Sequence, residues 1–181
     1  MELAIKIAVI YASKTGYSKK YAEWIKEALD ADMFSHKNIK KSKLNTYEVV
    51  IYGGGLYATG IYGFRRFLKH IYNGQKLFVY ATGAAPGRIS VLKEIFDANL
   101  KNLNPDEFKF YYLRGGFDFK KLSFFDKVLM LLLKSKLKRK KKLNKPLNGD
   151  EKGMLKAYEK PVNFSKEKFI APLVEDVKKV L

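Results

Sequence analysis

Short apolar runs alternate with amphipathic segments along most of this chain. The first run, 5–11, is rich in β-branched residues and too short for a helix, so it predicts a buried strand. In the segment 18–29 that follows, Tyr21, Ile25 and Leu29 fall on one helical face, which predicts a helix packed on a sheet. We therefore expect the chain to begin as a strand joined to a helix by a short loop.

The alternation continues toward the end of the chain. Further strands are expected at 32–35, 48–52, 76–81 and 108–113, and further helices at 62–72, 88–100 and 163–181. Pro172 lies inside the last helix and predicts a kink or two shorter helices there. Strands that alternate with helices predict an α/β fold with a parallel sheet and a ligand site beyond the carboxyl ends of its strands. At 181 residues we expect one domain over 1–181.

The loop between the first strand and the first helix consists mainly of small and hydroxylated residues. It holds Ser13, Lys14, Thr15, Gly16, Tyr17 and Ser18. Unpaired backbone N–H groups and the positive end of a helix dipole meet at such a loop, and hydroxyl groups add further donors, so it suits a phosphate. A serine-capped helix after an ordinary turn explains these six residues about as well. A Walker A loop is excluded because the chain has no Gly-Lys dipeptide.

The pattern Ser-x-Thr-Gly-x-Ser resembles the phosphate loop of flavodoxins, which bind flavin mononucleotide (FMN). Three later loops continue the resemblance, each after an apolar strand: Tyr-Gly-Gly-Gly-Leu-Tyr at 52–57, Tyr-Ala-Thr-Gly-Ala-Ala-Pro at 80–86 and Leu-Arg-Gly-Gly-Phe-Asp at 113–118. Within the flavodoxin-like superfamily, the chain is similar to the branch containing menaquinone-dependent protoporphyrinogen dehydrogenase. That branch has a similar Leu-Arg motif, followed by an apolar and basic insertion that contains an Asp.

The resemblance implies a fold and a cofactor site. The fold would be a three-layer α/β/α sandwich with a five-stranded parallel sheet in the order 2-1-3-4-5, and with a helical basic insertion at about 120–160. The first loop would hold the FMN phosphate. The flavin ring would lie between two loops, and Tyr57 would stack on it. The residues beside the ring would be Gly54, Gly55, Leu56 and Tyr57 in the second loop, and Thr82, Gly83, Ala84 and Ala85 in the third.

Alternatives to these cofactor roles remain open. A glycine turn with a surface Tyr explains the second loop without a cofactor, and a chain turn explains Arg114 to Gly116. No side chain is assigned a catalytic role, because FMN itself carries the redox chemistry. No metal site is expected, because His36 and His70 lie far apart without a ligand spacing.

Composition and charge narrow the class of function. The chain has no Cys, which excludes disulfides, thiolate nucleophiles and Cys-ligated iron–sulfur clusters. Its net charge of +18 predicts an acidic partner: an anionic membrane, an acidic protein or nucleic acid. Glu2 and Lys6 interrupt the first apolar run, so we expect no signal peptide and a cytoplasmic protein.

The charge gathers in one part of the predicted insertion. Leu122 to Leu133 predicts a helix that is apolar on all sides, but twelve helical residues span about 18 Å, short of the ~30 Å needed to cross a bilayer. Lys134 to Lys145 then holds eight Lys or Arg residues. Together the two segments predict docking on an anionic membrane surface. A core helix followed by a solvated lysine-rich loop is the main alternative, and nucleic-acid binding is a third.

We therefore expect an FMN-dependent oxidoreductase or electron-transfer protein that acts near a membrane quinone. Its partners would be quinone or a redox protein, and its location the cytoplasm or the inner face of the cell membrane. Protoporphyrinogen oxidation is the specific activity that the resemblance implies. The alternatives are a general quinone or small-molecule reductase, a soluble FMN electron carrier, and a nucleic-acid-binding protein on a flavodoxin fold.

Overall fold

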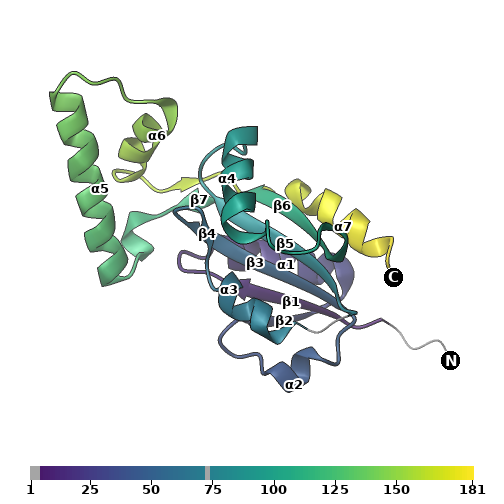
Figure 1. Cartoon of the computed structure of the whole chain (residues 1–181). Helices are drawn as coiled ribbons and strands as arrows, with labels where there is room; N and C mark the ends of the chain where they lie inside the picture. The colour runs from purple at the N-terminus through teal and green to yellow at the C-terminus, as the bar shows by residue number, and fades with distance from the viewer. Residues whose placement is uncertain (1–4, 72–73) are drawn as a thin grey trace.

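A computed structural model of the chain describes residues 5–71 and 74–181. Five parallel strands form its main sheet in the order β2-β1-β3-β5-β6 (Figure 1). The bounds of these strands are β1 Ile7–Ala12, β2 Asp32–Ser35, β3 Val49–Tyr57, β5 Lys76–Gly83 and β6 Phe108–Arg114. The fourth and fifth predicted strands correspond to β5 and β6, so the observed order β2-β1-β3-β5-β6 is the predicted order 2-1-3-4-5. The predicted α/β fold and strand order are therefore confirmed.

Helices cover both faces of the sheet. The bounds of the α-helices are α1 Tyr17–Leu29, α2 Lys41–Leu44, α3 Phe64–Phe67, α4 Ile89–Asn99, α5 Phe124–Lys142, α6 Gly149–Ala157 and α7 Ala171–Lys178. Short 3-10 helices are η1 Leu68–His70, η2 Pro105–Glu107, η3 Phe119–Lys121 and η4 Glu167–Ile170. Packing of α1 and α7 forms one apolar core around Val9, Ile51 and Tyr80. Packing of α3 and α4 forms the other, around Ile10 and Val79.

Two predicted helices differ from the structure, and one observed helix was not predicted. Helix α2 lies in the connection 36–45, where no element was expected. The predicted helix 62–72 is reduced to α3 and η1, because Gly63 precedes α3 with a positive φ of 78° and Ile71 is extended; Tyr72 lies outside the described residues. The predicted last helix is divided as Pro172 indicated, with η4 before α7 and the proline in the first turn of α7.

Strand β3 is longer than predicted, because it continues through the glycines that we expected to form a loop. Gly53 pairs with Tyr11 of β1 and Tyr80 of β5, so it lies inside the sheet. A Cβ at this position would lie 1.7 Å from the Tyr80 ring. Glycine at 53 therefore makes room for a core tyrosine. The strand then turns at Ala58, whose φ is 52°, into the short antiparallel strand β4 Gly60–Ile61.

The predicted insertion is present, and its ends lie side by side. Strand β7 Gly116–Phe117 pairs antiparallel with β8 Val162–Asn163, and α5 and α6 lie in the chain between them. Figure 1 shows α5 and α6 projecting on the side of the molecule away from α7. Tyr158 after α6 donates its hydroxyl to the carbonyl of Met130 in α5, at 2.6 Å.

Helix α5 corrects the expected division of the insertion into an apolar helix and a lysine-rich segment. The helix continues from Phe124 to Lys142, because Lys and Arg are good helix formers and are favoured at the negative end of the helix dipole. Its apolar residues are not a core: Phe124 and Phe125 are 75 % and 82 % exposed. The core-helix alternative is therefore wrong. No helix in the described part of the chain combines the length and apolarity needed to cross a bilayer.

Candidate functional site

Three of the predicted loops meet at the carboxyl edge of the sheet. Ser18, at the start of α1, and Thr82, near the end of β5, share a buried hydrogen bond of 2.6 Å between their hydroxyl groups. A Cβ on Gly55 of β3 would lie 3.5 Å from the Ser18 hydroxyl. Residues far apart in the chain therefore converge where the carboxyl ends of parallel strands place a ligand.

The first loop has the geometry of an anion-binding turn. Gly16 is the N-cap of α1 with a φ of 97°, a left-handed conformation that glycine adopts without strain. Its N–H donates to the Ser13 hydroxyl at 3.0 Å, which closes the turn. Thr15 between them is half-buried. The positive end of the 13-residue α1 therefore faces the same space as these groups.

Ser18 has a different environment from the one predicted. Its side chain is 1 % exposed, and its hydroxyl is occupied by Thr82 rather than directed into the loop. Its carbonyl accepts a 2.9 Å hydrogen bond from the fully buried Tyr80 hydroxyl. Ser18 thus anchors the start of α1 to β5, and its predicted contact with a phosphate stays a prediction.

Tyr17 links the first loop to the base of the insertion. Its hydroxyl donates to the carbonyl of Val162 in β8 at 3.0 Å. A Cβ on Gly116 would lie 2.5 Å from the Tyr17 ring, so that glycine allows the ring to pass beside β7. Burial, with the nearby Asp118 carboxylate adding to it, raises the pKa of Tyr17. The side chain therefore remains a neutral hydrogen-bond donor at pH 7.

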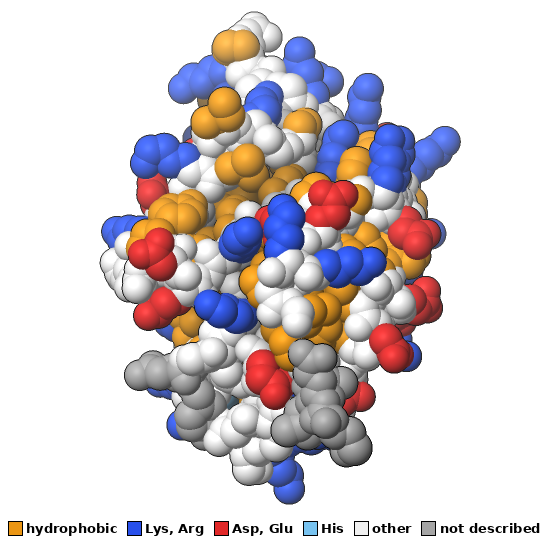
Figure 2. Space-filling view, turned by 90° about the vertical axis from the view of Figure 1, so that its right-hand side faces the viewer, with side chains coloured by type: hydrophobic (Ala, Val, Ile, Leu, Met, Phe, Trp, Pro, Cys, Tyr) orange, Lys and Arg blue, Asp and Glu red, His pale blue; other side chains and the backbone are white. Residues whose placement is uncertain are grey.

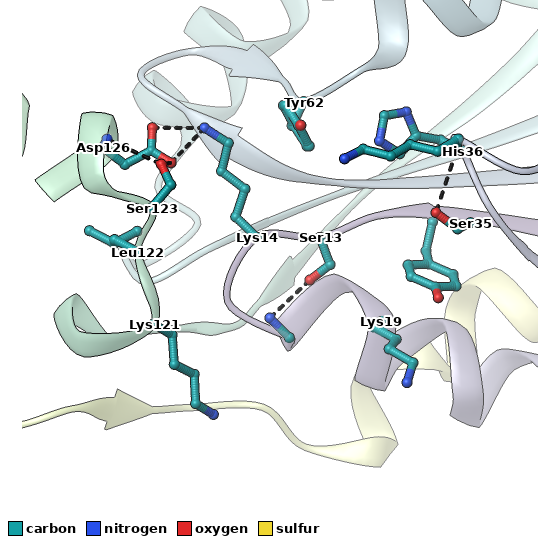
Figure 3. A pocket seen from close by; sticks show the side chains of 13 residues that line it. Ser13, Lys14, Lys19, Ser35, His36, Tyr62, Lys121, Leu122, Ser123 and Asp126 are labelled. Carbon is teal, nitrogen blue, oxygen red and sulfur yellow. Dashed lines mark hydrogen bonds and ion pairs between the residues drawn. The ribbon is translucent and has the colours of Figure 1, made fainter.

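A cavity of about 750 Å³ adjoins this loop (Figure 3). Its walls are formed by the first loop, the end of β2, Tyr62 and the start of the insertion. The lining residues are Tyr11, Ser13, Lys14, Gly16, Lys19, Ser35, His36, Lys37, Tyr62, Lys121, Leu122, Ser123 and Asp126. Four of them are lysines and one is a carboxylate, so the cavity is electropositive and suits an anion.

Lys14 and Asp126 join the first loop to α5. The Lys14 ammonium lies 2.8 Å from both carboxylate oxygens of Asp126, and the side chains of the two residues are 31 % and 6 % exposed. The Ser123 hydroxyl, which caps α5, donates to the same carboxylate at 2.8 Å. Burial would raise the pKa of Asp126, but hydrogen bonds from Lys14, Ser123 and Tyr57 lower it below its usual range. Asp126 is therefore ionised at pH 7.

Two tyrosines flank the same ammonium. The Lys14 Nζ lies 4.3 Å from the ring centroid of Tyr57 and 5.0 Å from that of Tyr62. Tyr57, at the end of β3, is 43 % exposed, so its ring is accessible for stacking. Lys14 already contacts one part of that aromatic surface. A flat ring stacked on the same face of Tyr57 would require the lysine to move.

The third loop is held by residues of β6. Tyr112 donates its hydroxyl to the carbonyl of Ala85 at 2.7 Å, and the Arg114 Nε donates to the carbonyl of Ala84 at 3.2 Å. A Cβ on Gly83 would lie 2.8 Å from the Tyr112 hydroxyl and 3.1 Å from Leu56, so glycine permits this packing. Arg114 therefore fixes the conformation of this loop.

The cavity includes only part of the predicted site. Ser13, Lys14 and Gly16 line it, whereas the other predicted residues do not: Thr15, Tyr17, Ser18, 54–57 and 82–85. Tyr62 and Asp126 also line the cavity, although neither was among the predicted site residues. The spacing Ser123-x-x-Asp126 is a helix-cap pattern that could have located the start of α5. No local pattern could have shown that Asp126 contacts Lys14, because 112 positions separate them.

The donor set fits a phosphorylated cofactor with an aromatic ring. The turn at Gly16, the start of α1 and the lysines of the cavity suit the phosphate, and the accessible Tyr57 ring suits a flat group. In the described residues, no cluster of three or more His, Asp or Glu side chains could hold a metal ion. Burial, followed by the charges of Lys37 and Arg66, lowers the pKa of His36, so the imidazole beside the cavity is neutral at pH 7.

Comparisons with known proteins identify a family and several similar structures. A family model described as "Flavodoxin domain" matches residues 8–144, from β1 to just beyond α5. The chain is similar to oxidised Flavodoxin 2 from Bacillus cereus, with 20 % identity, a TM-score of 0.42, and coverage of 60 % of this chain and 85 % of that one. It is also similar to a flavoprotein in complex with FMN from Lactobacillus acidophilus NCFM, with 14 % identity, a TM-score of 0.44, and coverage of 61 % and 93 %. No curated protein sequence matches the chain.

Proposed function

Because the chain belongs to the flavodoxin-domain family, which matches it over residues 8–144, we propose that it binds FMN and exchanges electrons with a membrane quinone. The cofactor site is the carboxyl edge of the sheet, where the first loop meets the electropositive cavity. The protein is then an FMN-dependent oxidoreductase or electron-transfer protein.

One observation carries the cofactor proposal. The turn at Gly16 and the positive end of α1 face a cavity whose walls hold Lys14, Lys19, Lys37 and Lys121. A phosphate dianion placed there meets backbone N–H groups and several ammonium groups together. FMN has such a terminal phosphate, and when bound it supplies redox chemistry that the side chains of this cysteine-free chain lack.

Different residues around the cavity would bind different parts of FMN. Ser13, Thr15 and the amides of the first loop would hold the phosphate, while Lys19 and Lys121 neutralise its charge. Tyr57 would pack on the flavin ring. The amides of Ala84 and Ala85, whose carbonyls are held by β6, would face the polar edge of the ring and stabilise negative charge there.

Two features support the electron partner and the substrate that we propose. The strongly basic insertion begins beside the cavity, which favours a partner at an anionic membrane, where quinones reside. The Leu113-Arg114 motif and the Asp-containing insertion resemble those of menaquinone-dependent protoporphyrinogen dehydrogenase. Protoporphyrinogen is therefore the substrate we propose, with a quinone as its electron acceptor.

Cofactor binding is tested with a matched pair of glycine variants. Gly16 and Gly74 have similar φ values of 97° and 94°, and a Cβ at either would meet nothing within 4 Å. Gly16→Ala and Gly74→Ala therefore introduce the same backbone strain, about 1 kcal/mol, but only Gly16 lies at the proposed site. We expect Gly16→Ala to weaken FMN binding by about tenfold in a fluorescence titration, while Gly74→Ala leaves it unchanged.

Two further measurements decide the proposal. The cofactor released from the reconstituted protein should have the mass of FMN; release of only FAD, or no flavin after reconstitution, would refute the cofactor. The FMN-loaded protein should oxidise protoporphyrinogen with menaquinone as acceptor. Bound FMN without any turnover would instead identify an electron carrier.

A further inference from the structure

The face of α5 that points away from the rest of the protein is divided along the helix axis. Its first half carries six exposed apolar side chains, here named the apolar face: Phe124, Phe125, Val128, Leu129, Leu131 and Leu132. The opposite side of the helix contains the two buried residues, Asp126 and Leu137. The apolar face is thus left in water although the helix has an inward side available for packing.

The second half of α5 carries positive charge on the same outward side. Lys136, Lys138, Arg139 and Lys142 are all exposed, and they follow the apolar face along the helix axis. Lys140, by contrast, points toward α6 and pairs with Glu151 at 2.8 Å. The outward side of α5 therefore changes from apolar to cationic within one continuous helix of 19 residues.

The positive charge of the whole protein is concentrated here. Residues 119–149 hold eleven Lys or Arg residues and one carboxylate, Asp126, so they account for more than half of the net charge of +18. Figure 2 shows the side of the molecule that lies to the right in Figure 1, away from α5, where Asp and Glu are interspersed with Lys and Arg. The charge asymmetry gives the protein one strongly cationic side.

We propose that α5 docks the protein on an anionic lipid membrane, with the apolar face inserted among the lipids and the basic half lying at their headgroups. The apolar face spans eight residue steps, about 12 Å of helix, which suits shallow insertion. The cations that follow can contact phosphates at the surface without entering the hydrocarbon. An apolar segment and a basic segment together give reversible attachment where either alone is marginal.

Other occupants of this surface fit it less well. A second copy of the chain packed parallel through the apolar face would bring the two basic halves together, with strong repulsion, and one packed antiparallel would leave both basic halves without an anionic partner. Nucleic acid would satisfy the cations but leave Phe124 and Phe125, 75 % and 82 % exposed, without an apolar partner. An anionic membrane satisfies both halves of the helix.

The start of α5 also relates this surface to the cofactor site. Asp126 lies one residue after Phe125 and holds Lys14 of the first loop. Because Asp126 lies on the side of α5 opposite the apolar face, docking would place the cavity behind the helix, about one helix diameter (~10 Å) from the lipid that holds the quinone. This consequence rests on the proposed function, whereas attachment to lipid does not require bound FMN and is tested without it.

The test is flotation of the full chain with vesicles of phosphatidylglycerol mixed with phosphatidylcholine, and with vesicles of phosphatidylcholine alone. We expect binding to the anionic vesicles that weakens as salt rises, and at least about tenfold weaker binding to the neutral ones. Binding that is equal on both lipids and indifferent to salt would overturn the charge half of the proposal.

Two variants separate the halves of the helix. Phe124→Ser/Phe125→Ser removes the most exposed part of the apolar face; its control, Ile89→Ser/Leu181→Ser, removes two apolar residues that are 86 % and 53 % exposed elsewhere. Lys138→Gln/Arg139→Gln/Lys142→Gln removes three cations of the basic half. Its control, Lys26→Gln/Lys168→Gln/Lys178→Gln, removes three exposed cations outside the insertion.

Each α5 variant should lower anionic-vesicle affinity by at least about tenfold, while each control changes it less than about threefold. All substituted residues are exposed, so unchanged thermal unfolding midpoints will show that folding is intact. Equal loss in an α5 variant and its control would overturn the proposal. So would an absence of flotation at low salt, or concentration-dependent self-association that the Phe124→Ser/Phe125→Ser variant abolishes.

Discussion

The ion pair between Lys14 and Asp126 should couple the stability of the first loop to that of the insertion. Replacing Asp126 by Asn keeps the shape of the side chain but removes the charge that holds the Lys14 ammonium at 2.8 Å. Replacing Lys14 by Met removes the other partner. The two single variants and the double variant form a thermodynamic cycle that isolates their interaction.

The magnitude follows from the burial of the two side chains. Exposed ion pairs contribute about 0–1 kcal/mol, and breaking a fully buried pair costs about 3–5 kcal/mol. Here the Asp126 side chain is 6 % exposed and the Lys14 side chain 31 %. We therefore expect Asp126→Asn to lower the free energy of unfolding by about 2 kcal/mol, or the melting temperature by about 4–8 °C for a chain of this size.

The assay is urea and thermal unfolding of the four proteins at pH 7. The coupling free energy should be about 1–2 kcal/mol. The exposed pair Lys93–Asp97 provides a control, since its side chains are 73 % and 48 % exposed and its coupling should be below about 0.5 kcal/mol. A coupling between Lys14 and Asp126 no larger than this control would refute the argument from burial.

The same pair predicts a dependence on pH. Because its hydrogen bonds lower the pKa of Asp126 below that in the unfolded chain, the stabilisation is complete above about pH 5. It is lost as the pH falls through the lowered pKa of the folded protein. The difference in stability between the native protein and Asp126→Asn should therefore shrink below about pH 4. A difference that stays constant down to pH 3 would contradict the assignment of this pKa.

Two further predictions concern the cofactor site. Tyr80→Phe removes the hydroxyl that donates to the Ser18 carbonyl at 2.9 Å. It should lower the free energy of unfolding in urea by about 1–2 kcal/mol and weaken FMN binding. Unchanged stability would show that this buried hydrogen bond contributes little. Lys37→Gln and Lys121→Gln each remove a positive charge from the cavity wall, so each should lower the reduction potential of bound FMN by some tens of millivolts in a redox titration. A potential that does not change in either variant would place the ring far from both lysines.

The sequence predicted the elements whose patterns are local. The β-branched runs located the strands, and the period of Tyr21, Ile25 and Leu29 located α1. Strand β2 was found with its observed bounds of 32–35, although its burial pattern is irregular. The parallel sheet followed from the alternation of strands with helices, and the order of its strands from the family resemblance.

The errors arose where tertiary contacts override local preference. The glycines after Tyr52 predict a loop by composition, yet Gly53 remains in β3 because the Tyr80 ring fills the space of its missing side chain. The apolar run in α5 was as compatible with burial in the core as with docking on a membrane. Only the structure shows that its outward side has no partner among the described residues. The contact of Asp126 with Lys14 was beyond prediction, because it joins an insertion to a loop 112 positions away.

The antiparallel pairing of β7 with β8 has a consequence for how the chain can vary. Gly116 faces Asn163 and Phe117 faces Val162, so the insertion leaves the flavodoxin-like body and returns to it at neighbouring points. The entropy of closing such a loop grows only slowly with its length, by about 0.6 kcal/mol for each doubling. Helices could therefore be added, shortened or exchanged beyond this ribbon while β6 and α7 keep their positions, which makes the ribbon a natural graft point for altering where the protein attaches.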